Sequence, residues 1–306
     1  MSYFQECSDL KVKERVLQVY DKTLESFKSD VEGLKVWLKT QPHLPQVLND
    51  RQIESFLILG KCNTEKVKSK IDMYFTLRAR FPDVFNNWHP LSERIKQAQR
   101  YVCFVPMPKL NKDLNRVFIM KIKPTDNPMD IDAYACFAYL MNVVEIRFLE
   151  DMCSGHIIIF DLENVKIGHV VKMTPMFIKT IFIIAERSLT TRAVAVHLVN
   201  APSSIDQTLF IAKTIIKPKL AERIIVHKGT DTAVTSLDKD VLPSDYGGNE
   251  KSLDDLEARF LKKFEEYKDF FDQREHWKVD EDLRPEKYDE DGFFGCYGNF
   301  KQLQVD

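Results

Sequence analysis

The sequence lacks the short motifs that mark common nucleotide-binding and hydrolytic enzymes. It has no G-x-G-x-x-G after a strand, no Walker loop, no G-x-S-x-G turn and no H-E-x-x-H pair. The closely spaced Gly292, Gly295 and Gly298 lie in a tail with no strand before them. Asp161 and Glu163 follow a predicted strand, but no nucleophile, metal-ligand set or phosphate loop accompanies them. We therefore predict no enzyme activity, no cofactor and no bound metal.

Long apolar runs are missing as well. The stretch from Met176 to Ala185 falls far short of the roughly 18 residues of a membrane span and contains a lysine. The N-terminus has no positively charged start followed by an apolar segment, so we expect no secretory signal. The cysteines form no C-x-x-C pair, which is typical of a reduced, cytosolic protein that uses them as small apolar residues. They are Cys7, Cys62, Cys103, Cys136, Cys153 and Cys296.

The chain also has little net charge. Its formal charge of −2 argues against a dedicated nucleic-acid-binding protein. Residues 250–291 contain 16 acidic and 9 basic side chains, so the rest of the chain has a positive balance and can form a local basic surface. A hydrophobic fraction of 44% is that of a globular protein and excludes wholesale disorder.

Residues 1–92 are predicted to form a helical module. Apolar residues recur there at steps of three and four, which is the period of an amphipathic helix. The pattern predicts a helix over residues 9–27, a second one capped by Asn49 or Asp50, and a third that begins at Thr64.

The next part of the chain, residues 93–250, is predicted to be an α/β domain. Its short segments rich in β-branched residues alternate with helical stretches, and some are almost unbroken apolar runs. Strands of that kind are covered on both faces, which indicates a mainly parallel or mixed sheet with helices packed on it. His156 and His197, in or beside these strands, are predicted to be core histidines. The predicted strands cover residues 116–122, 155–162, 192–199 and 223–227.

Helix start signals support this division of the chain. Thr174 followed by Pro175 reads as an N-cap with proline at the first helical position, and Ser252 reads as a second N-cap. Residues 253–271 carry an apolar stripe that predicts an amphipathic helix packed back on the core. This helix opens a C-terminal part, residues 251–306, that ends in a polar tail.

The helix expected after Pro202 has an apolar face that covers about half of its circumference, with Phe210 outside it. Pro218 ends or kinks it. Two interpretations remain open: a buried helix of an α/β layer, or a helix that closes a cavity while its basic flank touches an anionic membrane. The flanking basic residues are Arg187, Arg192, Lys213, Lys217, Lys219 and Arg223.

Several stretches favour the second interpretation. The runs IIIFDLENVKIGHVVKMTPMFIKTIF, AVHLVNAPSSIDQTLFIAKTIIKPKLAERIIVH and VLPSDYGG follow NDRQIESFLILGKCNTEKVKSKIDMYFTLRARFPDVF in that order. Together they resemble the CRAL-TRIO family of lipid-binding proteins, in its alpha-tocopherol-transfer and clavesin-like branch, over residues 45–250. The resemblance implies a helical N-terminal module and an α/β cage with an apolar cavity. A mobile lid helix, at about residues 203–217, would close that cavity.

The resemblance also implies functional residues. Phosphoinositide binding is carried over to Arg192, Lys219 and Arg223, whereas Val194 stands at a position that is usually basic. Lid and membrane contact is carried over to Phe210, Ile211, Lys213 and Lys217. The positions implied to line the cavity are Ala135, Ala138, Asn142, Phe160, Ile184, Leu189, Thr191, Val196, Thr208 and Leu209.

The function implied by this resemblance is that of an intracellular carrier. It would bind one hydrophobic molecule of the tocopherol, retinoid, carotenoid or phospholipid class and transfer it at phosphoinositide-containing membranes. The expected partners are that ligand and an anionic membrane surface, with no nucleic acid, for a monomeric cytoplasmic protein that associates transiently with internal membranes. The alternative is a phosphoinositide-binding trafficking adaptor whose acidic helix and tail recruit a protein partner.

Overall fold

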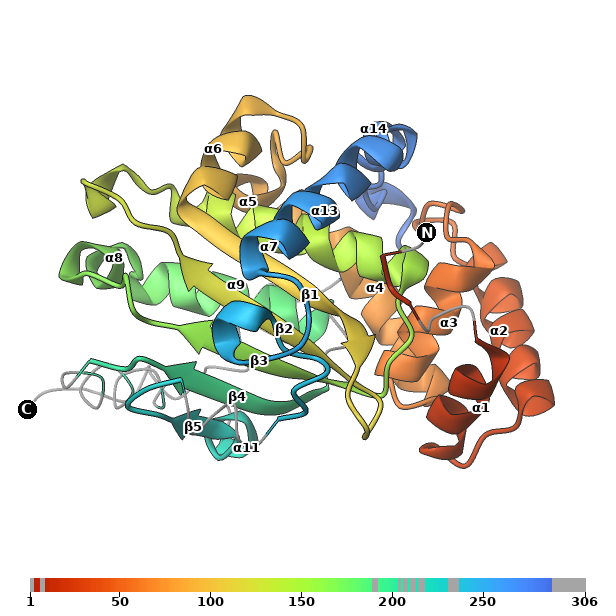
Figure 1. The fold of residues 1–306 in the computed structure, drawn as a ribbon. Coiled ribbons are helices and arrows are strands. Elements are labelled where there is room, and N and C mark those ends of the chain that lie inside the picture. Colours follow the sequence, from red (N-terminus) through yellow and green to blue (C-terminus); the bar gives the residue numbers. More distant parts are fainter. Residues whose placement is uncertain are drawn as a thin grey trace, which may run out of the picture.

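A computed structural model describes residues 3–5, 9–188, 192–202, 205, 209, 213, 218–230 and 237–287. The helices of residues 10–80 lie at one end of the molecule, and a sheet occupies its centre (Figure 1). Two long helices, α7 (Ala133–Glu150) and α9 (Pro175–Arg187), lie behind the sheet, while α13 (Leu253–Glu266) lies in front of it (Figure 1). The predicted α/β class is confirmed. The predicted domain boundaries at residues 92 and 250 stay predictions.

The N-terminal part is helical, as the apolar spacing predicted, but its first helix was predicted wrongly. The chain breaks after Gln18, Asp21 takes a left-handed backbone with φ 54°, and Thr23 starts a new helix with a capping box. Asn49 caps the third helix by accepting a bond from the backbone N–H of Gln52. The helices are α1 (Leu10–Gln18), α2 (Leu24–Lys39), α3 (Asp50–Leu59), α4 (Thr64–Arg80), α5 (Pro82–Phe85) and α6 (Glu93–Tyr101).

The sheet has five strands in the order β1-β2-β3-β4-β5. The first pair is antiparallel and the others are parallel, so the sheet is mixed. The four predicted strands are present, but the strand at the β1 edge was missed. Its prolines, Pro106 and Pro108, argue against a strand from sequence, yet an edge strand tolerates them because one side of it needs no partner. The strands are β1 (Val102–Leu110), β2 (Asn115–Ile122), β3 (Gly155–Asp161), β4 (Ala193–Val199) and β5 (Ile224–Val226).

The helices that accompany the sheet begin largely where their capping signals predicted. The Thr174 side chain accepts a bond from the N–H of Phe177, and Ser252 caps α13. The tail helix is split at Tyr267, and both halves bury apolar side chains. The longer elements are α7 (Ala133–Glu150), α9 (Pro175–Arg187), α13 (Leu253–Glu266) and α14 (Lys268–Arg274). The shorter ones are α8 (Ile167–Lys172), α11 (Pro218–Ala221), η1 (Pro128–Asp130), η2 (Ser244–Tyr246) and η3 (Glu281–Leu283).

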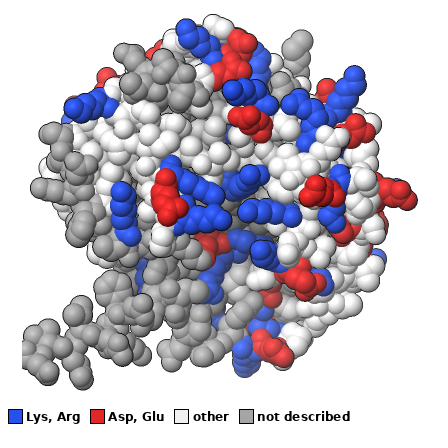
Figure 2. Space-filling view, turned by 90° about the horizontal axis from the view of Figure 1, so that it is seen from below, with Lys and Arg blue, Asp and Glu red and all other residues white. Residues whose placement is uncertain are grey.

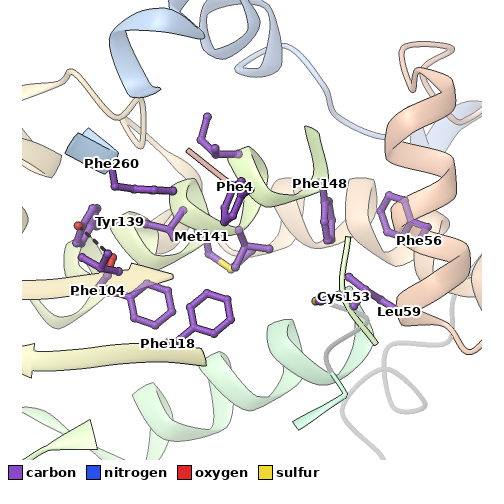
Figure 3. Close-up of a cluster of buried hydrophobic side chains, with 14 of the residues drawn as sticks. Phe4, Phe56, Leu59, Phe104, Phe118, Tyr139, Met141, Phe148, Cys153 and Phe260 are labelled. Carbon is purple, nitrogen blue, oxygen red and sulfur yellow. Dashed lines mark hydrogen bonds between the residues drawn. The ribbon is translucent and has the colours of Figure 1, made fainter. Parts of the chain in front are cut away.

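Helix α7 is buried along most of its length because it packs between the sheet and the N-terminal helices. Figure 3 shows how the aromatic residues meet around it. Phe104 and Phe118, from the neighbouring strands β1 and β2, stack with ring centroids 5.3 Å apart. The ring of Phe148 from α7 lies 5.0 Å from that of Phe56 on α3. One apolar core therefore joins the helical module to the sheet.

A cluster of charges is buried within this core. The carboxylate of Asp151, at the C-cap of α7, accepts bonds from Arg116 on β2 at 2.7 Å and from Arg147 on α7 at 2.8 Å. Arg147 also lies 2.7 Å from Nε2 of His156 on β3. Burial raises the pKa of Asp151, but the two guanidinium groups outweigh it and hold that pKa well below its ordinary value. Burial, and next Arg147, lower the pKa of His156, so its ring is neutral.

We expect Asp151→Asn to lower the free energy of unfolding by about 3–5 kcal/mol, because it leaves two buried arginines without their counter-charge. Urea unfolding at neutral pH measures this change, and Asp113→Asn, at an exposed position, is the control. A variant as stable as the parent would contradict this role of Asp151.

In the parent protein, the free energy of unfolding should fall below about pH 6.5, where His156 of the unfolded chain takes up a proton. It should fall again below about pH 4, where Asp151 of the unfolded chain takes up a proton.

Candidate ligand and membrane site

One face of the sheet is apolar across three neighbouring strands. The register aligns Phe118 with Ile158 and Val196, and it aligns Met120 with Phe160 and Leu198. Because side chains alternate across a strand, these six residues share one face. The guanidinium of Arg147 lies 4.8 Å from the Phe118 ring, so this is the face toward α7. Of the six, Met120, Ile158 and Phe160 are only half-buried, although they lie on the covered side of the sheet.

Several residues predicted to line the cavity lie around this face. Ala135 and Ala138 are buried on α7, and Ile184 is buried on α9. The rings of Tyr134 and Phe177 join these two helices at a centroid distance of 5.1 Å. Leu209 is half-buried. The predicted lining residues Leu189, Thr191 and Thr208 lie outside the described residues.

Asn142 does not match its predicted place in the lining of the cavity. It is fully buried on α7, and its amide nitrogen donates to the carbonyl of Trp88 at 2.8 Å. Its side-chain oxygen accepts a bond from Arg274 of α14 at 2.7 Å. Both ends of the amide are therefore engaged by the protein, and Asn142 anchors the C-terminal helix instead of facing a cavity.

The predicted basic residues do come together. Arg192, just before β4, donates to the Tyr20 hydroxyl at 3.5 Å, and the Arg223 guanidinium donates to the carbonyl of Ala193. Lys219 is exposed on α11. Figure 2 shows the side of the molecule where α11 and β5 lie, with Lys and Arg side chains gathered near its centre. Val194, at the position expected to be basic, is an exposed apolar residue on β4.

Sequence reasoning missed a further cation, Lys61. Desolvation lowers its pKa, although the residue is exposed, and so does the positive potential of Lys219, Arg192, Lys66 and Arg223, in that order. Lys61 therefore belongs to the same cluster, although the helical module supplies it. It stands just after α3 with φ 59°, a left-handed conformation that glycine adopts more readily. The basic cleft is defined here as Lys61, Arg192, Lys219 and Arg223.

The lid segment is described only at isolated positions. Lys213 is exposed and Ile205 is half-buried. Phe210, Ile211 and Lys217, which were predicted to contact the lid or the membrane, lie outside the described residues.

A second surface feature was also missed from sequence. An exposed apolar patch covers α8, the start of α9 and the neighbouring η1 turn, and Ile167 is its most exposed member at 83%. Gly168 allows this arrangement, because a Cβ atom there would lie 2.6 Å from the ring of Pro128. Isolated exposed apolar residues are common, but a contiguous group marks an interaction surface. The patch consists of Met129, Ile167, Val171, Met173 and Met176.

Asp161 and the two strand histidines, His156 and His197, have structural partners. Burial raises the pKa of Asp161, but bonds from the Tyr246 hydroxyl at 2.5 Å and from Asn200 at 2.8 Å hold it below its ordinary value. His156 bonds with Arg147, and Nδ1 of His197 lies 2.9 Å from Nε2 of His227. The described part of the chain contains no group of three metal-binding side chains. Among the described residues, no helix is long and apolar enough to cross a membrane.

Comparison with known proteins agrees with this architecture. Residues 99–248 match the CRAL/TRIO domain, and residues 23–95 match the Pinta-like UBA domain. The chain belongs to the CRAL-TRIO family.

The curated relatives of this CRAL-TRIO protein include the alpha-tocopherol transfer protein-like proteins of Homo sapiens and Mus musculus. They are 25% and 24% identical to it over 233 residues. The matched region covers 74% of this chain and 66% of each relative, about two thirds of their length. The crystal structure of Sfh5 aligns with a TM-score of 0.47 and 12% identity, over 81% of this chain and 99% of that one.

Proposed function

We propose that this protein is a carrier, and not an enzyme, that binds one hydrophobic lipid-like molecule and transfers it at membranes. The observation that carries the proposal is the half-buried row of Met120, Ile158 and Phe160 on the covered face of the sheet. Apolar side chains in such a position favour an apolar ligand, because burying them against it removes their surface from water. Membership of the CRAL-TRIO family supports the same conclusion.

The ligand is proposed to lie between this sheet face and the helices α7 and α9. The small buried side chains of Ala135 and Ala138 on α7 are proposed to border the ligand, and Phe160, Ile184 and Val196 are proposed to supply apolar walls. The segment over residues 203–217 is proposed to close this space as a lid. The ligand classes in view are tocopherols, retinoids, carotenoids and phospholipids. The names of the alpha-tocopherol transfer protein-like relatives support the first of these.

Two surfaces are proposed to bring the carrier to a membrane. The basic cleft would bind phosphoinositide headgroups, since each Lys or Arg near an anionic surface contributes about 1 kcal/mol. The apolar patch on α8 would enter the interface between headgroups and acyl chains. We propose a monomeric cytoplasmic protein that associates with membranes transiently.

The alternative function is that of a trafficking adaptor. Testing it requires a chain that lacks the C-terminal tail but keeps the fold. Arg284, just after η3, donates to the Asp72 carboxylate of α4 at 2.8 and 3.0 Å and to Thr76 at 2.8 Å. Removing this residue would break the side-chain bonds that hold the C-terminal segment to α4. A chain that ends at Lys287 therefore tests the tail without loss of this contact.

We expect the purified protein, expressed in a eukaryotic host, to retain one stoichiometric lipid species. Native mass spectrometry followed by solvent extraction identifies it. The chain that ends at Lys287 should carry the same lipid, because the proposed cavity lies far from the tail in sequence. Lipid-free protein, or a heterogeneous mixture, would count against a carrier. Loss of a protein partner in the truncated chain, with no lipid in either form, would favour the adaptor.

The double variant Lys219→Glu, Arg223→Glu should bind phosphoinositide vesicles at least tenfold more weakly, because it reverses two charges of the cleft. Lys61→Gln should bind these vesicles roughly fivefold more weakly, because it removes one positive charge. Vesicle co-sedimentation measures both effects, and the amount of co-purified lipid should not change. The control is Lys112→Glu, Lys262→Glu, at two exposed lysines outside the cleft. Parent-like binding by the first variant would exclude the basic cleft as the headgroup site.

The double variant Ile167→Asp, Val171→Asp should weaken binding to neutral and anionic vesicles alike. The two side chains are 83% and 61% exposed, so the loss should come from membrane contact and the melting temperature should stay the same. We expect at least a tenfold loss, given about 1.5–3 kcal/mol for each fully buried side chain of this kind. Val36→Asp, at a residue 64% exposed on α2, is the matched control. An equal loss in both variants would rule out a specific docking patch.

A further inference from the structure

A polar hollow of about 550 Å³ lies outside every site described so far. Three segments form it: the C-terminal end of α6, the loop after β2 and the loop after β3. The loops are tied together, because Asn164 donates to the carbonyl of Ile122 at 3.0 Å and Lys166 donates to that of Thr125 at 2.7 Å. The lining residues are Arg100, Tyr101, Pro124, Thr125, Asp126, Asn164 and Lys166.

The position of the hollow in the sheet favours ligand binding. Strands β2 and β3 are parallel neighbours, and the hollow lies where both of them end. The carboxyl ends of the strands are the edge of an α/β sheet at which ligand sites commonly lie. The proposed lipid cavity lies over a face of the sheet, so the hollow is a separate place.

The charges that line the hollow are not neutralised by one another. Arg100 and Asp126 are both exposed, and among the described residues neither side chain forms an ion pair or a hydrogen bond. The ammonium group of Lys166 has one bond, to a carbonyl, and no carboxylate partner within the described part of the chain. By contrast, nearby Lys123 pairs with Glu257 at 2.7 Å. The hollow thus offers two cations and one anion to a ligand.

The hollow also borders the apolar patch. Lys166 is the N-cap of α8 and directly precedes Ile167, the most exposed residue of that patch. On the other rim, the loop after β2 leads through Asp126 to Pro128, against which Gly168 packs. If the patch enters a membrane, as proposed above, the hollow lies at the level of the lipid headgroups.

We propose that this hollow binds a phosphoserine headgroup, that of phosphatidylserine. This headgroup carries a phosphate and a carboxylate, which match Arg100 and Lys166, and one ammonium group, which matches Asp126. Charge-assisted hydrogen bonds of this kind are the strong ones, and the carboxylate of Asp126 disfavours headgroups without an amine. The proposal rests on membrane contact through the α8 patch. It adds a lipid preference that the basic cleft does not provide.

The test compares vesicles that contain phosphatidylserine or phosphatidylglycerol at equal mole fraction, and therefore at equal net charge. The parent protein should bind the phosphatidylserine vesicles roughly tenfold more tightly, since charged hydrogen bonds distinguish the two headgroups. Asp126→Asn should abolish this preference by weakening the binding of phosphatidylserine only. Arg100→Gln should weaken the binding of both vesicles. Asp269→Asn and Arg15→Gln, at exposed positions outside the hollow, should behave like the parent.

Soluble O-phosphoserine distinguishes a lipid headgroup from a free metabolite. It should compete with the phosphatidylserine vesicles for the parent protein and not for Asp126→Asn. Binding of O-phosphoserine without any vesicle preference would overturn the assignment to a membrane lipid. Equal binding of the parent to both vesicles, with no binding of O-phosphoserine, would overturn the site itself and leave the carrier function intact. No binding to either vesicle would instead contradict the membrane contact on which the proposal rests.

Discussion

The carboxylate of Asp151 holds together the elements on which the rest of the structure depends. Arg116 reaches it from the central sheet and Arg147 from α7, while His156 joins the cluster from the next strand. Two buried arginines beside one carboxylate are tolerated only when each has well-placed partners, so this arrangement determines how α7 sits on the sheet. The same placement positions α7 over the apolar face of the sheet, and the ligand is proposed to lie between them.

A second buried carboxylate connects α7 to the helical module. Glu145 accepts bonds from the Tyr74 hydroxyl at 2.7 Å and from Arg78 at 2.5 Å, both on α4. Because these contacts are buried, the N-terminal helices are part of the same packed body as the sheet. This explains how Lys61, from the helical module, reaches Arg192 and Arg223, which directly precede β4 and β5, and Lys219 on α11. The basic cleft is thus a product of the whole fold.

The surfaces proposed to meet a membrane differ in chemistry. The basic cleft has positive charges from segments far apart in the chain, which suits a strongly anionic headgroup. The α8 patch is apolar, and the hollow beside it has charges of both signs. In the proposed function these surfaces would divide the work. Charge would attract the protein to a membrane, apolar contact would retain it, and the mixed-charge hollow would distinguish lipids of equal net charge.

Local patterns in the sequence were sufficient for much of the fold. The β-branched runs predicted four strands, and Thr174, Asn49 and Ser252 marked helix starts, because strand propensity and helix capping depend on neighbouring residues. The break between α1 and α2 was not visible, since the apolar spacing continues through it. The strand with Pro106 was not visible either, since only the sheet order shows that it lies at an edge.

For the functional residues, too, some properties follow from the sequence and others only from the fold. The sequence alone determined that Arg192, Lys219 and Arg223 are basic and that the chain has the motifs of its family. Only the tertiary structure placed Lys61 beside them and engaged Asn142 with Trp88 and Arg274. The physical reason is that a residue's charge and polarity are local properties, whereas its neighbours and its exposure depend on how distant segments pack. The exposed patch on α8 and the hollow beside it are therefore features that folding alone creates.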